Sequence, residues 1–439
     1  MKKTLVYAAT CLATMVFLYG CSSGENSEKQ KDSPKGAKKE LVVWDWTDPY
    51  KKELAGPMEI VLDQYKKDNP DVELKIEQIN NDNMRTKLLA AVSANNLPDV
   101  AYLDGQWLSE FKDVGILADL TPFMTDWSGK TDFPKAVWDS VTFDGHTFGV
   151  PGDGDVRTLL YRKDLLAKAG YSNPPKTWSE LVEVAKKIQK VGAAEGIEYG
   201  FALNGGNSEH TSMRSLPYIW DLGGDFIDAQ GQPALNSEPV LKTVQFLSDL
   251  VSQYKVAPPD SYLKTKREVA ASIIGGQTAM AIVGSWEWRS DANFLAQANL
   301  KDKLGSAPIP VPDGVDPAKA ATAVGYGTWV IFKDSDAKQA GWNWIEKVTS
   351  AQHEINIFKD GTGNMPMRLS AYKDPVFTSD PIFSSFVDTI PNARSRPKTN
   401  NYELLSQSYR DAIQKVLSGK QKSEDALKEA QDKVKASWK

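Results

Sequence analysis

Aromatic residues stand next to carboxylates at three places where apolar runs of the sequence end. The three places read Trp44-Asp45-Trp46-Thr47-Asp48, Asp104-Gly105-Gln106-Trp107 and Gly284-Ser285-Trp286-Glu287-Trp288. A flat ring suits the apolar C–H face of a sugar, and carboxylates accept hydrogen bonds from its hydroxyls. Because hydrogen bonds to charged groups contribute about 1.5–3 kcal/mol each, a few carboxylates can orient a neutral polyol. Each tryptophan alone is as readily a packing residue, but the clustering favours a ligand site.

A second candidate group is the glycine-rich, charged stretch Pro151 to Arg157, which precedes the apolar run Thr158 to Tyr161. We interpret it as a flexible crossover that carries ligand acceptors, because a hinge needs a few residues able to absorb backbone change. A calcium loop is the less favoured alternative, since the bidentate glutamate at loop spacing is missing. A plain surface turn is a further alternative for this stretch.

The third group consists of arginines in loops bounded by glycine and proline, at Gly363 to Arg368 and Ala393 to Pro397. Their guanidinium groups could donate to sugar hydroxyls or pair with surface carboxylates. For Arg396 we favour a surface ion pair.

Composition excludes several other chemistries. The only cysteines are Cys11 and Cys21, and the three histidines are far apart, which excludes a His/Cys zinc site and gives no partner for a catalytic triad. A net charge of −5 argues against a nucleic-acid partner. No nucleotide-binding G-x-x-x-x-G-K-[ST] motif occurs. We therefore expect no cofactor, no metal and no catalytic residues.

The elements that position the first group follow from periodicity. Apolar runs and amphipathic stretches alternate as strand 41–44, helix 57–67, strand 72–76, helix 84–94 and strand 99–103. This order predicts a parallel sheet with helices on both faces, whose ligands lie beyond the carboxyl ends of the strands. Further along, the patterns predict helices over 164–169, 179–191 and 240–253, a strand over 279–283 and a last helix from Ser423.

The N-terminus has the features of a secretory leader, with two lysines before an apolar stretch from Thr4 to Tyr19. Gly20-Cys21 closes it and resembles the bacterial lipobox, in which the cysteine is diacylated, although Tyr19 departs from the usual small residue there. A leader cleaved elsewhere is the alternative. We predict a signal peptide at 1–20 and a lipidated Cys21 with a flexible tether at 21–40. The expected location is the extracellular face of the cell membrane, held by a lipid anchor.

Short motifs from residue 41 onward, taken together, resemble the family 1 extracellular solute-binding proteins of ABC sugar importers, the maltose-binding-protein-like lipoproteins. The motifs are Asn69-Pro70-Asp71-Val72, Leu97-Pro98-Asp99-Val100, Gly145 to Pro151, Leu160 to Leu165, Pro174 to Trp178, and Gly276 to Ile282 with Gly284-Ser285-Trp286. The resemblance implies an α/β fold of the two-lobed periplasmic-binding-protein type (type II), with mixed sheets flanked by helices and joined by hinge crossovers. It places lobe one at 41–153 with 308–350, and lobe two at 157–305 with 352–439.

The resemblance also implies site residues. Asp48 matches a sugar-binding acid after the first strand, Asp104 lies near the acid after Pro-Asp-x-x, and Asp155 matches the acid six residues before Tyr161. Trp286 matches a stacking tryptophan, and Tyr402 lies near a second stacking aromatic, whereas residues 207–220 depart from the maltose binder. The full expected ligand set is Trp46, Asp48, Asp104, Asp155, Arg157, Trp220, Trp286, Tyr326, Arg368, Arg394 and Tyr402.

The implied function is capture of a sugar, with an oligosaccharide favoured, by a monomeric lipoprotein that delivers it to the permease subunits of an ABC transporter. One alternative is a binder of another solute, such as a polyamine or glycerol-3-phosphate. Another is a secreted glycoside hydrolase that uses paired carboxylates.

Overall fold

The computed structural model describes residues 38–46, 55–289, 300–360 and 363–438. The predicted leader, Cys21, Asp48 and the predicted tether up to residue 37 lie outside these residues, whereas residues 39–40, predicted as the end of the tether, belong to the first strand. The chain divides into residues 1–38 and a compact unit, Lys39–Lys439, and all that follows concerns the second.

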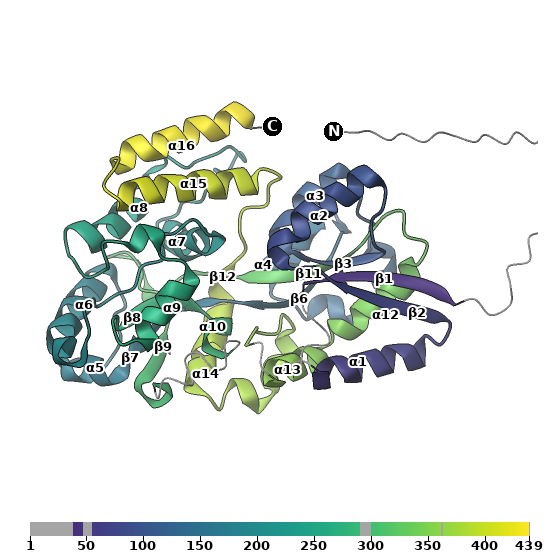
Figure 1. Ribbon diagram of the computed structural model, residues 1–439, viewed down its shortest axis with the longest axis horizontal. Helices are drawn as coiled ribbons and strands as arrows, with labels where there is room; N and C mark the ends of the chain where they lie inside the picture. The colour runs from purple at the N-terminus through teal and green to yellow at the C-terminus, as the bar shows by residue number, and fades with distance from the viewer. Residues whose placement is uncertain (1–37, 47–54, 290–299, 361–362, 439) are drawn as a thin grey trace, which may run out of the picture. The chain divides into compact units, whose positions relative to one another are not determined.

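The first sheet has five strands in the order β2-β1-β3-β11-β6 (Figure 1). Their bounds are β1 Lys39–Asp45, β2 Val72–Gln78, β3 Val100–Asp104, β6 Val150–Asp155 and β11 Gly325–Ile331. β1 is parallel to β2 and β3, as predicted. β11 runs antiparallel to both β3 and β6, so the sheet is mixed rather than wholly parallel.

Helices cover this sheet because each has one apolar side. They are α1 Ala55–Asp68, α2 Asn81–Ala94, α3 Leu108–Val114, α4 Lys135–Val141, α12 Lys338–Val348 and α13 Ala351–Asp360. Tyr65 of α1 is fully buried against Trp344 of α12, and its hydroxyl donates to the Ala340 carbonyl at 2.9 Å. The Asn69 side chain donates to the Tyr65 carbonyl at 2.9 Å and so satisfies a carbonyl of the last turn of α1.

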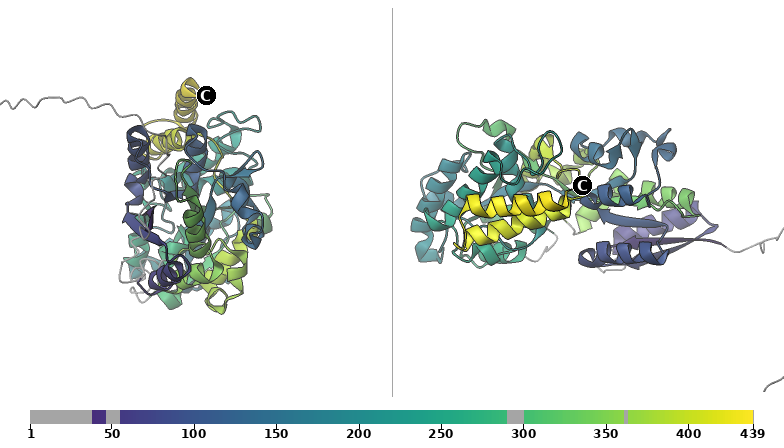
Figure 2. Two further views of the ribbon diagram at one scale, coloured as in Figure 1. Left: turned by 90° about the vertical axis from the view of Figure 1, so that its right-hand side faces the viewer. Right: turned by 90° about the horizontal axis from the view of Figure 1, so that it is seen from above.

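The second sheet has three antiparallel strands, β7 Arg157–Arg162, β8 Met280–Gly284 and β9 Leu304–Ala307, in the order β8-β7-β9. Its helices are α5 Lys163–Lys168, α6 Trp178–Gly192, α7 Glu209–Asp221, α8 Glu238–Ser252, α9 Lys266–Ile274, α10 Ser285–Arg289, α15 Tyr402–Leu417 and α16 Ser423–Ser437. Figure 2 shows α15 and α16 side by side. A separate core that includes Leu159, Ile188 and Leu247 holds this part together.

The chain crosses between the two sheets within the stretch predicted as a hinge. β6 ends at Asp155 and β7 begins at Arg157, so Val156 alone separates a strand of the first sheet from a strand of the second. Residues 151–157 therefore form the end of β6 and the start of β7 rather than a calcium loop. A short parallel pair, β10 Thr322–Ala323 with β12 Ala393–Arg394, lies where the chain passes between the sheets again.

Two segments pack differently from the predicted lobe boundaries. Val311 exchanges backbone hydrogen bonds of 2.9 Å with Lys176 and Trp178, so the start of the 308–350 segment belongs with the second sheet. α13 packs on α1 and α12, beside the first sheet. The chain returns to the first sheet only at β11, which explains the first difference.

α14, Pro381–Thr389, packs on β7 and β9 of the second sheet.

The remaining short strands, β4 Thr142–Phe143 and β5 His146–Thr147, form a hairpin of their own. None of the helices in the described part of the chain combines the length and the apolar character that a membrane span requires.

Candidate ligand-binding site

Three of the predicted site residues meet at the crossover between the sheets. Asp155, at the end of β6, accepts from Arg157 Nη1 at 2.9 Å and from Trp286 Nε1 at 2.8 Å. Trp286 reaches it from α10, which begins directly after β8, and β8 pairs with β7 so that Gly284 lies opposite Arg157. Residues 131 positions apart are thus joined in one contact because β8 ends beside the start of β7, which directly follows β6.

The charges at this crossover are buried and paired. Asp155 is 6% exposed and Arg157 3% exposed. Burial lowers the pKa of Arg157, and the neighbouring Asp155 carboxylate opposes that effect. A carboxylate offers about four acceptor positions, so Asp155 retains capacity for ligand hydroxyls after its two contacts with protein.

A second buried ion pair supports α10 and with it Trp286. Arg214 of α7 donates to both oxygens of Glu287, at 2.8 and 2.6 Å. Glu287 also accepts from the Gly284 backbone at 2.7 Å. Both contacts come from one nitrogen, Arg214 Nη2, and together with the Gly284 backbone they hold Glu287 at the start of α10.

Two basic side chains lie against the Trp286 ring. The Lys266 ammonium is 4.4 Å from the ring centroid, within the range of a cation–π contact. The His210 ring centroid lies 5.6 Å away, with the rings inclined at 47°. Burial and nearby cations, Lys266 first among them, hold the pKa of His210 well below its usual range, so His210 is neutral near pH 7.

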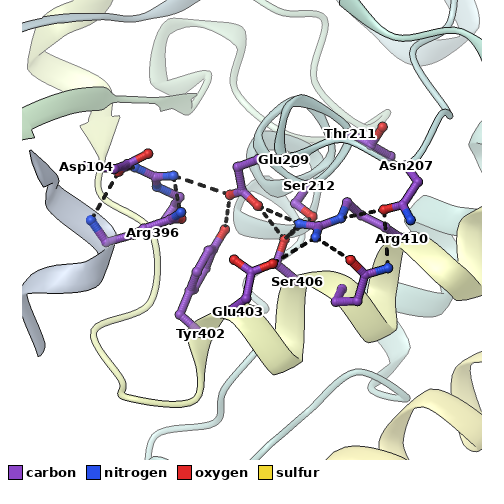
Figure 3. A network of polar contacts seen from close by, with 12 residues as sticks. Asp104, Asn207, Glu209, Thr211, Ser212, Arg396, Tyr402, Glu403, Ser406 and Arg410 are labelled. Carbon is purple, nitrogen blue, oxygen red and sulfur yellow. Dashed lines mark hydrogen bonds and ion pairs between the residues drawn. The ribbon is translucent and has the colours of Figure 1, made fainter. Parts of the chain in front are cut away.

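A network of ion pairs starts at Asp104, at the carboxyl end of β3 (Figure 3). Asp104 accepts from the Gln106 backbone at 3.2 Å and from the guanidinium of Arg396. Arg396 also donates to the Gln106 side chain at 2.6 Å. The Arg396 side chain is only 6% exposed, so it forms an ion pair as predicted, but an internal one rather than one on the surface.

Glu209, in the first turn of α7, lies at the centre of this network, between Arg396 and Arg410 (Figure 3). Its carboxylate accepts from Tyr402 Oη at 2.6 Å, Ser406 Oγ at 2.6 Å, Arg410 Nη1 at 2.8 Å and Arg396 Nη1 at 3.4 Å. Burial and the charge of Glu209 raise the pKa of Tyr402 well above its usual range. The predicted stacking aromatic therefore lies in the network, with its hydroxyl committed to Glu209.

The start of α7 connects the two groups. Glu209 belongs to the network with Asp104 and Tyr402, and the next residue, His210, contacts Trp286. Sequence reasoning missed Glu209, His210, Lys266 and the internal role of Arg396. The signal available was an acid and a histidine, Glu209-His210, directly after Ser208, at the position of a helix start.

Trp46, the first residue after β1, packs on Tyr102 of β3. Its ring centroid lies 4.3 Å from that of Tyr102, which also stacks on Trp329 at 4.6 Å. The Tyr102 hydroxyl donates to Asp153, two residues before Asp155 on β6. Burial raises the pKa of Asp153, whose other oxygen accepts from Asn364 at 2.7 Å.

Four predicted site residues have other surroundings, and they are Tyr326, Trp220, Arg394 and Arg368. Tyr326 shares a hydrogen bond with Ser140 and lines a cavity of about 20 Å³ with Arg396. Trp220 is buried, and the Arg394 guanidinium lies 4.8 Å from the centroid of its ring. Arg394 also forms an ion pair with Asp225 at 3.6 Å.

Arg368 departs furthest from its predicted role. Its guanidinium donates to the Thr349 and Gly129 carbonyls, both at 2.6 Å, and lies over the rings of Trp127 and Phe133. It is 4% exposed and its donors are committed to the interior. We therefore leave Arg368 out of the candidate site.

Within the described ranges, no group of three or more His, Cys, Asp or Glu side chains is placed to hold a metal ion. What the arrangement offers is an indole edge and face, several carboxylates with remaining acceptor positions, and buried guanidinium donors. Such a set binds and orients a polar solute.

Comparison with known proteins gives consistent results over most of the chain. A solved ABC transporter solute-binding protein from Thermotoga lettingae, bound with alpha-D-tagatose, is 27% identical with a TM-score of 0.76, covering 91% of this chain and 99% of that one. The maltose-bound MalE3 of T. maritima is 28% identical with a TM-score of 0.75, covering 90% and 99%. The maltotriose-binding protein of Pyrococcus abyssi is 22% identical, covering 90% of this chain and 81% of its own.

The family match extends through both sheets. The model of the bacterial extracellular solute-binding protein family matches residues 48–355, which include β6, β7, α7 and α10. The two-sheet architecture joined at Asp155–Arg157 is the fold that the resemblance predicted. The chain belongs to the family of bacterial extracellular solute-binding proteins.

Proposed function

We propose that the protein captures a carbohydrate outside the cell and delivers it to the permease of an ABC importer, held at the membrane by a lipid on Cys21. The observation that supports the proposal is the contact of Trp286 with Asp155, in which an indole ring and a carboxylate lie together at the crossover. The tagatose- and maltose-bound relatives support the ligand class. In this proposal the chain acts as a monomer and performs no catalysis.

The mechanism is closure of the two parts of the fold over the ligand. Asp104 and Asp155 end strands of the first sheet, whereas Glu209, Trp286 and Tyr402 belong to helices of the second. A sugar that contacts both sets favours the closed arrangement, and it does so only by its higher affinity for that arrangement. Moving the population from 1:99 to 99:1 requires about 5.5 kcal/mol. One stacking contact and two or three hydrogen bonds to charged groups supply that amount.

A titration followed by tryptophan fluorescence tests the proposal. Neutral and acidic mono- and oligosaccharides, a polyamine and glycerol-3-phosphate are added in turn to the purified protein. We expect saturable binding of at least one carbohydrate and none of the polyamine, because Trp286 and Lys266 lie at the site. Binding of the polyamine alone would contradict the proposal. Release of reducing ends from an oligosaccharide would instead favour the hydrolase alternative.

A further inference from the structure

Lys266 occupies an unusual position beside the site. It is the first residue of α9, and its ammonium lies over the Trp286 ring at 4.4 Å. The residue is partly buried, and among the described residues its side chain forms no ion pair and no hydrogen bond. The neighbouring lysine, Lys264, differs in that it pairs with Asp260 at 2.8 Å.

The other buried charges around Trp286 occur in pairs. Asp155 is paired with Arg157 at 2.9 Å, and Glu287 is paired with Arg214 at 2.6 Å. These four charges cancel. In the part of the chain that the structure describes, Lys266 therefore has no carboxylate partner, and the exposed Arg267 beside it adds to the positive charge.

The next group of charges does not supply the missing partner. Asp104 is paired with Arg396, and Glu209 with Arg410 at 2.8 Å and with Arg396 at 3.4 Å. His210, which faces the same indole, adds no negative charge. Among the buried and half-buried charges nearest the indole (Asp155, Glu287, Arg157, Arg214 and Lys266), there is thus an excess of one positive charge, on Lys266.

We propose that the ligand is a carbohydrate that bears an anionic group, a carboxylate or a phosphate, and that Lys266 binds this group while Trp286 stacks on the sugar ring. This inference rests on the proposed function and narrows its substrate class. An anion would give Lys266 the partner that the protein lacks, and hydrogen bonds with a charged partner are the strong ones. Burial lowers the pKa of Lys266 in the protein as it stands, so the ammonium is held there at a cost that an anion offsets.

A variant with a matched control isolates the charge. Lys266→Met keeps the unbranched stem that covers the indole and removes the ammonium. Lys264→Met makes the same change two residues away, at the lysine that already has a partner. Thermal melting of both variants establishes that they are folded as the unchanged protein is.

Calorimetry then compares acidic and neutral sugars on all three proteins. The probes are digalacturonate and glucose 6-phosphate as the acidic sugars, with maltose, cellobiose and glucose as the neutral ones. We expect the unchanged protein to prefer an acidic sugar, and the two acidic probes to distinguish a carboxylate from a phosphate. Lys266→Met should lower affinity for that sugar about ten- to hundredfold, and affinity for neutral sugars by less than about threefold. Lys264→Met should change neither.

Two results would overturn the inference, and they differ in what else they affect. If neutral sugars bind and acidic sugars bind no better, or if Lys266→Met leaves the ratio of the two affinities unchanged, the anionic ligand is refuted while carbohydrate capture stands. If the folded, unchanged protein binds no sugar of either kind, the proposed function is refuted together with the inference.

Discussion

The clearest pH dependence is expected from Asp221, the last residue of α7. One oxygen of its carboxyl accepts from the Ala321 backbone at 2.9 Å. The other oxygen is buried and has no hydrogen-bond partner among the described residues. Burial raises the pKa of Asp221 from an ordinary value of 3.8 to about 7. We predict that Asp221→Asn removes a pH-dependent loss of stability.

The sign follows from proton binding. With the raised pKa, the folded protein binds the Asp221 proton more tightly than the unfolded chain does. The associated stability is fully present below about pH 4 and is lost as the pH rises to about 7. At 1.36 kcal/mol for each pKa unit, the difference between 3.8 and about 7 is at most about 4 kcal/mol. Because Asp221 is only partly buried, we expect roughly 2–3 kcal/mol.

Urea denaturation at pH 5 and pH 8 measures this effect. Asp221→Asn keeps the acceptor for the Ala321 backbone, so its free energy of unfolding should exceed that of the unchanged protein by about 2 kcal/mol at pH 8. The advantage should shrink at pH 5, where the unchanged carboxyl is mostly protonated. Asp63→Asn, at an exposed position of α1, serves as the control. An equal difference between variant and unchanged protein at both pH values would refute the reasoning.

Two further substitutions test the ion network and a helix start. Arg396→Met should lower the free energy of unfolding by about 3 kcal/mol, because it leaves Asp104 and Glu209 without their shared cation. A loss below about 1 kcal/mol in urea denaturation would mean that the network contributes little. Thr177→Ala should cost about 1 kcal/mol, since the Thr177 hydroxyl accepts from the Glu180 backbone at 3.3 Å at the start of α6. Unchanged thermal melting would show that this cap is not needed.

Local patterns in the sequence predicted much of the fold. The alternation of apolar and polar residues placed β1, α1, β2, α2 and β3 within a few residues of their observed bounds. The antiparallel position of β11 was not predictable in this way. β11 pairs with β3 from more than 200 residues away, so its place depends on tertiary contacts rather than on its own periodicity.

The candidate site shows the same division. Trp286 was predicted from its residue type at a strand end and Asp155 from the charged crossover stretch and the family resemblance, and the structure joins the two side chains. The ion pair of Glu209 with Arg396 joins residues 187 positions apart and depends on where α7 lies, so no local sequence pattern predicts it. Arg368 has the loop setting of a ligand residue, yet the carbonyls of Thr349 and Gly129, distant in sequence, take up its donors.

Calorimetric titration of Trp286 variants with the best carbohydrate from the fluorescence panel tests the central claim most directly. Trp286→Phe keeps an aromatic face but removes the Nε1 donor to Asp155, and Trp286→Ala removes both. We expect a loss of about tenfold in affinity for the first and no measurable binding for the second, while Trp138→Phe, in the aromatic cluster with Trp127 and Phe133, binds normally. Unchanged affinity in a folded Trp286→Ala protein would contradict the account.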